Sequence, residues 1–198
     1  VPVQDKGRGK TRQGRFWVYV GDSIHHYAVF DYTADRTRAG PVNWLGDYEG
    51  YLQADAYAGY DVLYATQNVV EVSCWAHARR KFYDARLTDP GRCLQAMAWI
   101  KRLYAVEREA KTAKLDVEQR QQLRQEKSVP LLEQFKPWLD EQSEQVLPKS
   151  PTNEAIQYLR SRWTSFTRYT ESGILAIDNN LSENTLRCVA LGRKNWLF

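Results

Sequence analysis

The sequence predicts an α/β fold of the α+β type, in which a few-stranded sheet is interrupted by an α-helical insertion that precedes one last helix. Near the start of the chain, apolar residues recur at every second position, which is the period of a β-strand. From residue 75 onward they recur three and four positions apart, which is the period of a helix. Gly173 ends this helical block before a final helix start at residues 178–183. An interrupted sheet accounts for this order of strands, helices and one final helix.

Length and composition indicate a globular protein. A chain of 198 residues with 43% hydrophobic and 13% aromatic residues can bury a substantial core, so we expect one domain with an inserted subdomain. No run approaches the roughly 18 apolar residues of a membrane span, and the first residues lack the pattern of a signal peptide. Cys74, Cys93 and Cys188 are few and scattered, which is typical of reduced thiols. We therefore expect a cytoplasmic protein with no membrane partner.

The formal charge of +4 is small, but it is unevenly distributed. Basic residues cluster at positions 6–15, 79–86 and 187–194, whereas residues 115–145 lean acidic. Separate basic clusters around candidate acidic residues would suit the phosphate backbone of a nucleic acid. Any one cluster taken alone is explained equally well as solvated surface charge.

The strands are predicted in two groups. Residues 15–21 and 27–32 alternate at strand period around turn-forming residues, which predicts a β-hairpin. A short helical segment should follow Gly40 and Pro41. Residues 51–56 and 69–74 are predicted as two further strands. In the first of these, Leu52, Ala54 and Ala56 would face the core, and Asp55 would point away from it near the strand end.

The helical block begins directly after the last strand. A helix from Trp75 should place Ala78, Phe82 and Ala85 on its buried side. Three further helices are expected: one with a stripe of Cys93, Met97, Ile100 and Tyr104, a polar one over residues 117–126, and one with a stripe of Leu131, Leu132, Phe135, Trp138 and Leu139. Pro137 should kink or split the last of these. Ser150 and Pro151 are typical of a helix start, with Ala155, Leu159, Trp163 and Phe166 marking the helix that follows.

Asp55 and Glu183 are the best candidates for metal ligands. Hard divalent cations bind carboxylate oxygens, and two-metal phosphoryl transfer needs several converging acids. Each residue also has a structural explanation. Asp55 could be a solvated residue on an alternating strand, and Glu183 could close a capping box with Asn180 and pair with Arg187. By itself, the pattern around Glu183 favours the structural explanation.

His77 follows Cys74 at a spacing that gives half of a zinc site, but the sequence has no second pair at this spacing. His77 lies on a basic helix face, where a phosphate contact and an ordinary surface histidine are both plausible. The sequence contains no nucleophile elbow, P-loop or dinucleotide-binding glycine motif. These absences argue against hydrolase chemistry of the Ser-His-Asp kind and against nucleotide-dependent chemistry.

Four blocks of the sequence, taken together, resemble a known family. They are LQADAYAGY at 52–60, CWAHARRKF at 74–82, DNNLSE at 178–183 and GRKNWLF at 192–198. In this order they are similar to the signature blocks of the bacterial insertion-sequence transposases labelled insertion sequence sixty-six. The resemblance extends over nearly the whole chain, and four blocks are far more specific than one short motif.

The resemblance implies a ribonuclease-H-like catalytic core with a mixed sheet and an Asp/Asp/Glu triad. This core would comprise residues 1–88 and 172–198, and residues 89–171 would form the α-helical insertion. Asp55 would be the second acid and Glu183 the third, together binding two Mg²⁺ or Mn²⁺ ions for DNA cleavage and strand transfer. The residues expected to contact DNA or to order the site are His77, Arg79, Arg80, Lys81, Arg187, Arg193 and Lys194.

The family pattern positions the first acid just ahead of the stretch that matches residues 1–3, so this sequence lacks that acid. Asp5 and Asp22 are not convincing replacements. We therefore expect little or no strand transfer by these 198 residues alone. The expected partners are double-stranded DNA, at transposon ends and target, with a homodimer on DNA and accessory transposon proteins as further candidates. The expected location is the bacterial cytoplasm, at the nucleoid when bound to DNA.

Two other functions remain open at this stage. The first is a non-enzymatic DNA-binding remnant of a transposon, in which the basic clusters survive without chemistry. The second is a glycoside hydrolase that uses Asp55 and Glu183 as its two carboxylates, which suits the many Trp and Tyr residues but leaves the basic clusters without a role.

Overall fold

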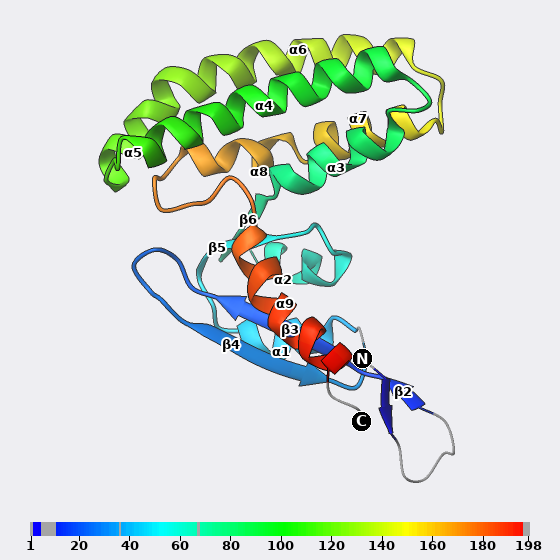
Figure 1. Ribbon diagram of the computed structural model, residues 1–198, viewed down its shortest axis with the longest axis vertical. Helices are drawn as coiled ribbons and strands as arrows, with labels where there is room; N and C mark the ends of the chain where they lie inside the picture. Colours follow the sequence, from blue (N-terminus) through cyan, green and yellow to red (C-terminus); the bar gives the residue numbers. More distant parts are fainter. Residues whose placement is uncertain (1, 5–10, 36, 67, 196–198) are drawn as a thin grey trace. The chain divides into compact units, whose positions relative to one another are not determined.

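The structure is a computed structural model that describes residues 2–4, 11–35, 37–66 and 68–195 (Figure 1). Side chains are described from Gly14 to Gly192, apart from residues 36, 67 and 190. Helices and small sheets combine in an α+β fold, which confirms the predicted class. The chain divides into two compact units. The mixed unit comprises Val1–Leu52, Ala56–Glu71 and Asn179–Phe198, and the helical unit comprises Gln53–Asp55 and Val72–Asp178.

Six strands pair two by two among the described residues. These pairs are β1 (Pro2–Gln4) with β2 (Thr11–Gln13), β3 (Arg15–Val20) with β4 (Ala28–Thr33), and β5 (Gly50–Ala54) with β6 (Val69–Ser73). The predicted hairpin is confirmed, because β3 and β4 are antiparallel, with Trp17 opposite Asp31. No larger sheet joins the described strands, so the ribonuclease-H-like sheet stays a prediction.

Aromatic side chains of β3 position the short helices of the mixed unit. Tyr19 stacks on Trp44 of α1 (Ala39–Leu45), with ring centroids 5.4 Å apart. Trp17 contacts the rings of Tyr57 and Tyr60 around η1 (Ala58–Tyr60), which precedes α2 (Asp61–Tyr64). The last helix, α9 (Asn180–Asn195), packs along β3. Among the described side chains of this unit, the buried hydrophobic cluster is small and consists of Leu45, Leu63 and Val69.

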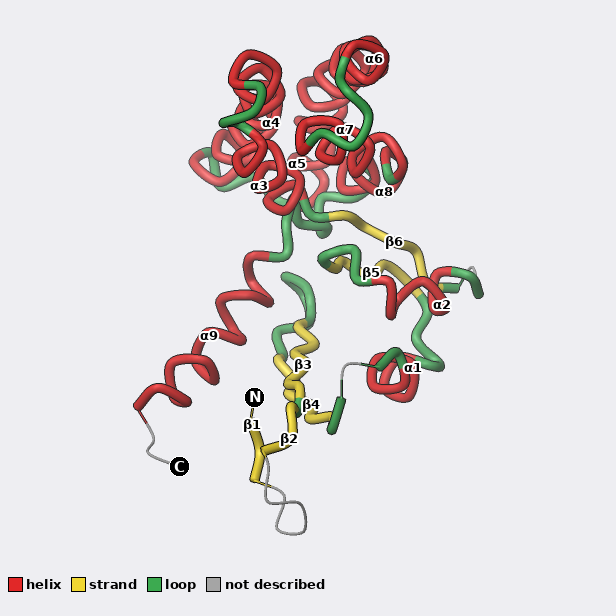
Figure 2. Tube along the Cα trace, turned by 90° about the vertical axis from the view of Figure 1, so that its right-hand side faces the viewer, coloured by secondary structure: helices red, strands yellow, loops and turns green. Residues whose placement is uncertain are grey.

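Four helices of the helical unit form a bundle, in which each helix packs against two others (Figure 2). In cyclic order they are α3 (Trp75–Ala85), α4 (Pro90–Thr112), α6 (Val129–Gln145) and α7 (Pro151–Ser161). The core of this bundle confirms the predicted stripes, since Ala78, Phe82, Cys93, Ile100, Phe135 and Leu139 are buried. Cys74, Cys93 and Cys188 are free thiols. Among the described residues, we find no helix with the length and apolar character needed to span a membrane.

Three helix boundaries differ from the predictions. Helix α6 continues through Pro137, so the predicted split is wrong, and the alternative of a kink stays a prediction. The carbonyl of Glu133 loses its helical partner at Pro137, and both residues lie at exposed positions. Helix α7 ends at Ser161, and Trp163 begins a separate helix, α8 (Trp163–Thr167). The polar helix predicted over residues 117–126 is α-helical only over α5 (Val117–Leu123), and a π-helical turn follows over Arg124–Ser128. The predicted helix start at Ser150 is confirmed, since its hydroxyl accepts the N–H of Asn153.

Candidate functional site

Asp55 lies directly after β5 and is exposed. The residue that follows it, Ala56, has a φ of 58°, a left-handed conformation that costs free energy for a residue with a side chain. The chain therefore turns sharply just after the carboxylate. Gln53, two residues earlier, donates a hydrogen bond of 2.7 Å from Nε2 to the carbonyl of Ala176. This bond connects the strand that precedes Asp55 to the segment that precedes α9.

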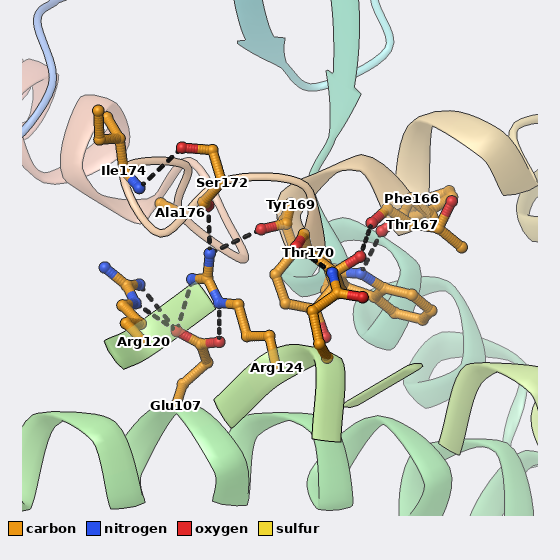
Figure 3. Close-up of polar contacts among 12 residues, drawn as sticks. Glu107, Arg120, Arg124, Phe166, Thr167, Tyr169, Thr170, Ser172, Ile174 and Ala176 are labelled. Atoms are coloured by element: carbon orange, nitrogen blue, oxygen red, sulfur yellow. Dashed lines mark hydrogen bonds and ion pairs between the residues drawn. The ribbon is translucent and has the colours of Figure 1, made fainter. Parts of the chain in front are cut away.

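The segment from Tyr169 to Asp178 leads towards α9, and its first half is held by a buried arginine (Figure 3). Arg124 is 0% exposed and donates from Nη1 to the carbonyls of Tyr169, at 2.6 Å, and Ser172, at 2.8 Å. Its Nε and Nη2 donate to the two carboxylate oxygens of Glu107, at 2.7 and 2.8 Å. Arg120 donates to the same carboxylate at 2.7 Å. Four of the five N–H donors of Arg124 thus have acceptors, which satisfies its buried charge.

Two glutamines and a glycine complete this half of the segment. Gln121 and Gln125 donate side-chain hydrogen bonds of 2.7 Å to the carbonyls of Glu171 and Thr170. Gly173 is buried so close to the backbone of Val117 that a Cβ atom at this position would collide with it. Every residue from 169 to 173 is therefore fixed by the backbone or side chains of α5 and the π-helical turn.

The second half of the segment is held by α3, α4 and β5. The N–H of Trp75 donates to the carbonyl of Ile177 at 3.1 Å, next to the Ala176 carbonyl that Gln53 binds. Tyr104 of α4 donates a hydrogen bond of 2.7 Å from its hydroxyl to Oδ2 of Asp178. Burial, followed by this bond to the Asp178 carboxylate, raises the pKa of Tyr104 well above its usual range. The tyrosine therefore stays a neutral donor at physiological pH.

Glu183 lies in the first turn of α9 and is exposed, and its N–H donates to the carbonyl of Asn179 at 3.2 Å. The partial positive charge of a helix N-terminus favours a carboxylate at such a position. Because α9 begins at Asn180, this asparagine is the first helical residue and not the residue before the helix that the predicted capping box requires. Asp55 belongs to the helical unit and Glu183 to the mixed unit.

The residues predicted to contact DNA lie on two helices. On α3, His77 is half-buried, and Arg79, Arg80 and Lys81 are exposed. Lys81 places its Nζ 4.7 Å from the centre of the Tyr158 ring. On α9, Arg187 is exposed, whereas the side chains of Arg193 and Lys194 lie outside the described residues. These roles in DNA contact stay predictions.

Asp55 and Glu183 offer carboxylate oxygens, the ligand type that Mg²⁺ and Mn²⁺ prefer. Within the described part of the chain, no group of three or more histidine, cysteine, aspartate or glutamate side chains is arranged to hold a metal ion. The donor chemistry of these two acids fits a hard divalent cation, and a complete site would need further ligands.

Sequence reasoning missed the residues that hold the segment before α9. Arg124 lies in a run rich in Gln, Arg and Glu that was predicted as a polar helix, yet Arg124 is fully buried. Its partner Glu107 is 17 positions away, so no local spacing indicates the pair. Gln53 and Tyr104 are equally remote in sequence from Ala176 and Asp178. Gly173, which the packing against Val117 requires, was the only local signal in this region.

Comparison with known families identifies the class to which this chain belongs. The chain belongs to the Transposase IS66 family, which it matches over residues 1–198. Membership of this family confirms the resemblance carried by the four sequence blocks.

The curated relatives are proteins of Sinorhizobium fredii. Uncharacterized protein y4hP is 33% identical to the chain over 221 residues, a match that covers 100% of the chain and 39% of y4hP. Uncharacterized proteins y4jD and y4qI are each 28% identical to the chain. Both matches cover 100% of the chain, and they cover 41% of y4jD and 39% of y4qI. The chain thus spans about two fifths of the length of these relatives. No solved structure matches it.

Proposed function

We propose that this chain is the part of a DNA transposase that contributes the second and third carboxylates of an Asp/Asp/Glu metal site. In this proposal Asp55 and Glu183 are metal ligands, and the reactions are DNA strand cleavage and strand transfer. The observation that carries the proposal is the match of the whole chain to a transposase family, with both acids inside signature blocks. The first acid of the triad would come from residues that precede Val1 in a longer protein.

The local structure around each acid supports this proposal. Asp55 is exposed at the end of a strand, followed by a sharply turned backbone, and backbone strain of this kind is frequent at functional sites. The segment that precedes α9 is bonded to Gln53, two residues from Asp55, and to the first residue of α3. Glu183 follows this segment in the first turn of α9. The strand that precedes Asp55 and the segment that leads to α9 are therefore both held by hydrogen bonds.

In the proposed reaction a water oxygen forms a bond to a DNA phosphorus while the bond from phosphorus to the 3′ oxygen breaks. The released 3′ hydroxyl then attacks a phosphodiester of the target, where a second 3′ oxygen leaves. Two bound Mg²⁺ or Mn²⁺ ions would activate the attacking oxygen and stabilise the leaving oxygen. Asp55 and Glu183 would hold these ions, and His77, Arg80 and Lys81 on α3 would bind the phosphates on either side.

The test uses the full-length protein that contains this chain, with transposon-end DNA and Mn²⁺. Asp55→Asn and Glu183→Gln remove one charge each and keep the side-chain shape. Each should reduce cleavage by at least roughly a thousandfold, because the loss of one member of a catalytic set removes most of the rate enhancement. The measurement is the amount of nicked DNA at fixed protein concentration, with far-ultraviolet circular dichroism to confirm folding.

Two matched control variants are available in the chain. Asp61 and Glu154 are exposed acids in the first turns of α2 and α7, so Asp61→Asn and Glu154→Gln make the same chemical change at comparable positions. Both should cleave DNA like the wild type. Cleavage that does not change with Glu183→Gln would refute the assignment. A full-length protein that binds DNA but shows no metal-dependent cleavage would establish the non-enzymatic remnant instead.

A further inference from the structure

The charged side chains of helix α4 differ in how they are compensated. Glu107 is bonded to Arg120 and Arg124, and Glu109 to Lys127, so both of its acids have cationic partners on the following helical segments. The cations Lys101, Arg108 and Lys111 are exposed. Among the side chains that the structure describes, no carboxylate lies within 4.0 Å of these three cations.

The three cations form one stripe, because they stand seven and three positions apart on a continuous helix. Tyr104 occupies the position between Lys101 and Arg108 on the same side. At 1.5 Å per residue, the stripe extends over about 15 Å. We call Lys101, Arg108 and Lys111 the α4 stripe.

Helix α4, which carries the α4 stripe, packs against α3 (Figures 1 and 2). Arg79 of α3 is exposed. The Asp178 carboxylate receives the hydrogen bond of Tyr104. Lys101 and Arg108 of the α4 stripe therefore flank, along α4, the residue that anchors Asp178 just before α9.

Helix stabilisation does not explain this arrangement. A cation in the last turn interacts favourably with the helix C-terminus, which accounts for Lys111. Lys101 and Arg108 lie before the last turn, where this interaction has faded, and the helix offers neither of them an acid three or four positions away. Three like charges on one side of a helix repel each other, so their arrangement favours a polyanionic partner.

We propose that the α4 stripe is a binding surface for the phosphate backbone of double-stranded DNA, separate from the contacts proposed for α3 and α9. The choice of DNA as the polyanion rests on the proposed function. The cations lie on one helix, and the aromatic side chain between them, Tyr104, is half-buried with its hydroxyl bonded to Asp178, which suits backbone contact and not the stacking of bases. The helical unit then contributes to holding DNA as well as to fixing the segment before α9.

The test measures binding of a fluorescein-labelled DNA duplex of arbitrary sequence by the 198-residue chain, using fluorescence anisotropy in EDTA. The stripe variant is Lys101→Gln, Arg108→Gln and Lys111→Gln combined. The control variant, Lys136→Gln, Lys149→Gln and Arg38→Gln combined, also removes two lysines and one arginine, at positions outside α4. Melting curves confirm that both variants fold.

The stripe variant should bind at least about tenfold more weakly near 50 mM salt, because each phosphate contact releases counterions. The slope of log Kd against log salt should fall by about 2 to 3, and the control should change it by less than about 1. Equal effects of the two variants, or no binding of duplex DNA by the wild type, would overturn the proposal. The binding assay contains EDTA and measures no cleavage, so failure of the proposed catalysis would appear only in the cleavage assay.

Discussion

The two units of the chain differ in how completely they bury their large apolar side chains. The helical unit surrounds large apolar side chains completely, and Trp75, Phe82, Ile100, Phe135 and Phe166 are at most 1% exposed. Among the side chains that the structure describes, the mixed unit has a buried hydrophobic cluster of three residues, and several of its large aromatic side chains are at least one third exposed, among them Phe16, Phe30, Tyr32 and Trp44.

This difference indicates where the free energy of folding comes from. The hydrophobic contribution is roughly proportional to the apolar area removed from water, so the helical unit gains most of it. A two-stranded hairpin such as β3 and β4 is marginal without packing on its faces. We therefore expect changes in the helical unit to cost far more stability than equivalent changes in the mixed unit.

The first comparison changes one tryptophan in each unit to alanine, and the larger loss of stability should occur in the helical unit. Trp75→Ala should lower the free energy of unfolding by about 3–5 kcal/mol, because it leaves a cavity among the rings of Phe135, Trp163 and Phe166. The same change also removes the 2.9 Å hydrogen bond from Trp75 to the Phe166 carbonyl. Urea unfolding followed by circular dichroism measures the change.

Trp44→Ala is the matched change in the mixed unit. Trp44 is 50% exposed and stacks on one ring, Tyr19, so we expect a loss of about 1 kcal/mol. Equal losses for the two alanine variants would refute the view that stability is concentrated in the helical unit.

The next largest effect concerns the buried charge. Arg124→Met should cost about 3 kcal/mol, since it leaves the Glu107 carboxylate and the carbonyls of Tyr169 and Ser172 without this donor. This loss of stability is at the low end of the range for breaking a buried ion pair, because Arg120 still binds Glu107. Urea unfolding gives the change, and Lys127→Met, which breaks an exposed ion pair with Glu109, is the control at about 0.5 kcal/mol.

A double variant distinguishes the charge from the packing. Arg124→Met combined with Glu107→Leu removes both buried charges and should recover most of the loss, as buried ion pairs replaced by apolar residues often do. A double variant that is less stable than Arg124→Met alone would show that the arginine acts chiefly through the two carbonyls.

A smaller effect is expected at the anchor of Asp178. Tyr104→Phe removes the 2.7 Å hydrogen bond to the half-buried Asp178 carboxylate, and we expect a loss of about 1–2 kcal/mol. Tyr83→Phe on α3 removes a hydroxyl from a ring that is 45% exposed and should be neutral. Amide hydrogen exchange should show faster exchange at residues near Asp178 in Tyr104→Phe only, and unchanged exchange there would contradict the anchoring role.

Local pattern predicted most elements, because strand and helix periods are properties of a few consecutive residues. The hairpin of β3 and β4, the strand leading into Trp75 and the helix start at Ser150 all follow from such spacing. Arg124 could not be predicted in the same way. A buried and an exposed arginine look alike in a polar run, and what buries this one is a segment 45 to 48 positions away.

The candidate site could be predicted only in part. Local pattern placed Asp55 near a strand end and Glu183 at a helix start, as the structure has them. Their pairing as metal ligands came from the resemblance to a family, because the convergence of two acids that are 128 positions apart leaves no periodic trace. Their catalytic roles therefore stay predictions for the cleavage assay to decide.

The smallest effect contrasts one carboxylate from each unit. For Asp22, in the turn of the hairpin, the pKa lies below its usual value because the N–H of His25, and then that of Ile24, donates to it. For Glu107, burial raises the pKa, but the bonds from Arg124 and Arg120 outweigh burial and lower it. Each group should stabilise the protein above its unfolded pKa, near 4, and lose this contribution as pH falls through its depressed pKa.

The size of the two contributions should differ, since the side chain of Asp22 is 39% exposed and that of Glu107 10%. Asp22→Asn should therefore change the free energy of unfolding at neutral pH by less than about 0.5 kcal/mol. In Arg124→Met, carbon-13 NMR titration should show a higher pKa for Glu107, because burial still raises this pKa and only Arg120 remains to lower it. The pKa of Asp22 should stay low. Parallel movement of the two pKa values would mean that the units do not respond separately, and the contrast between them would fail.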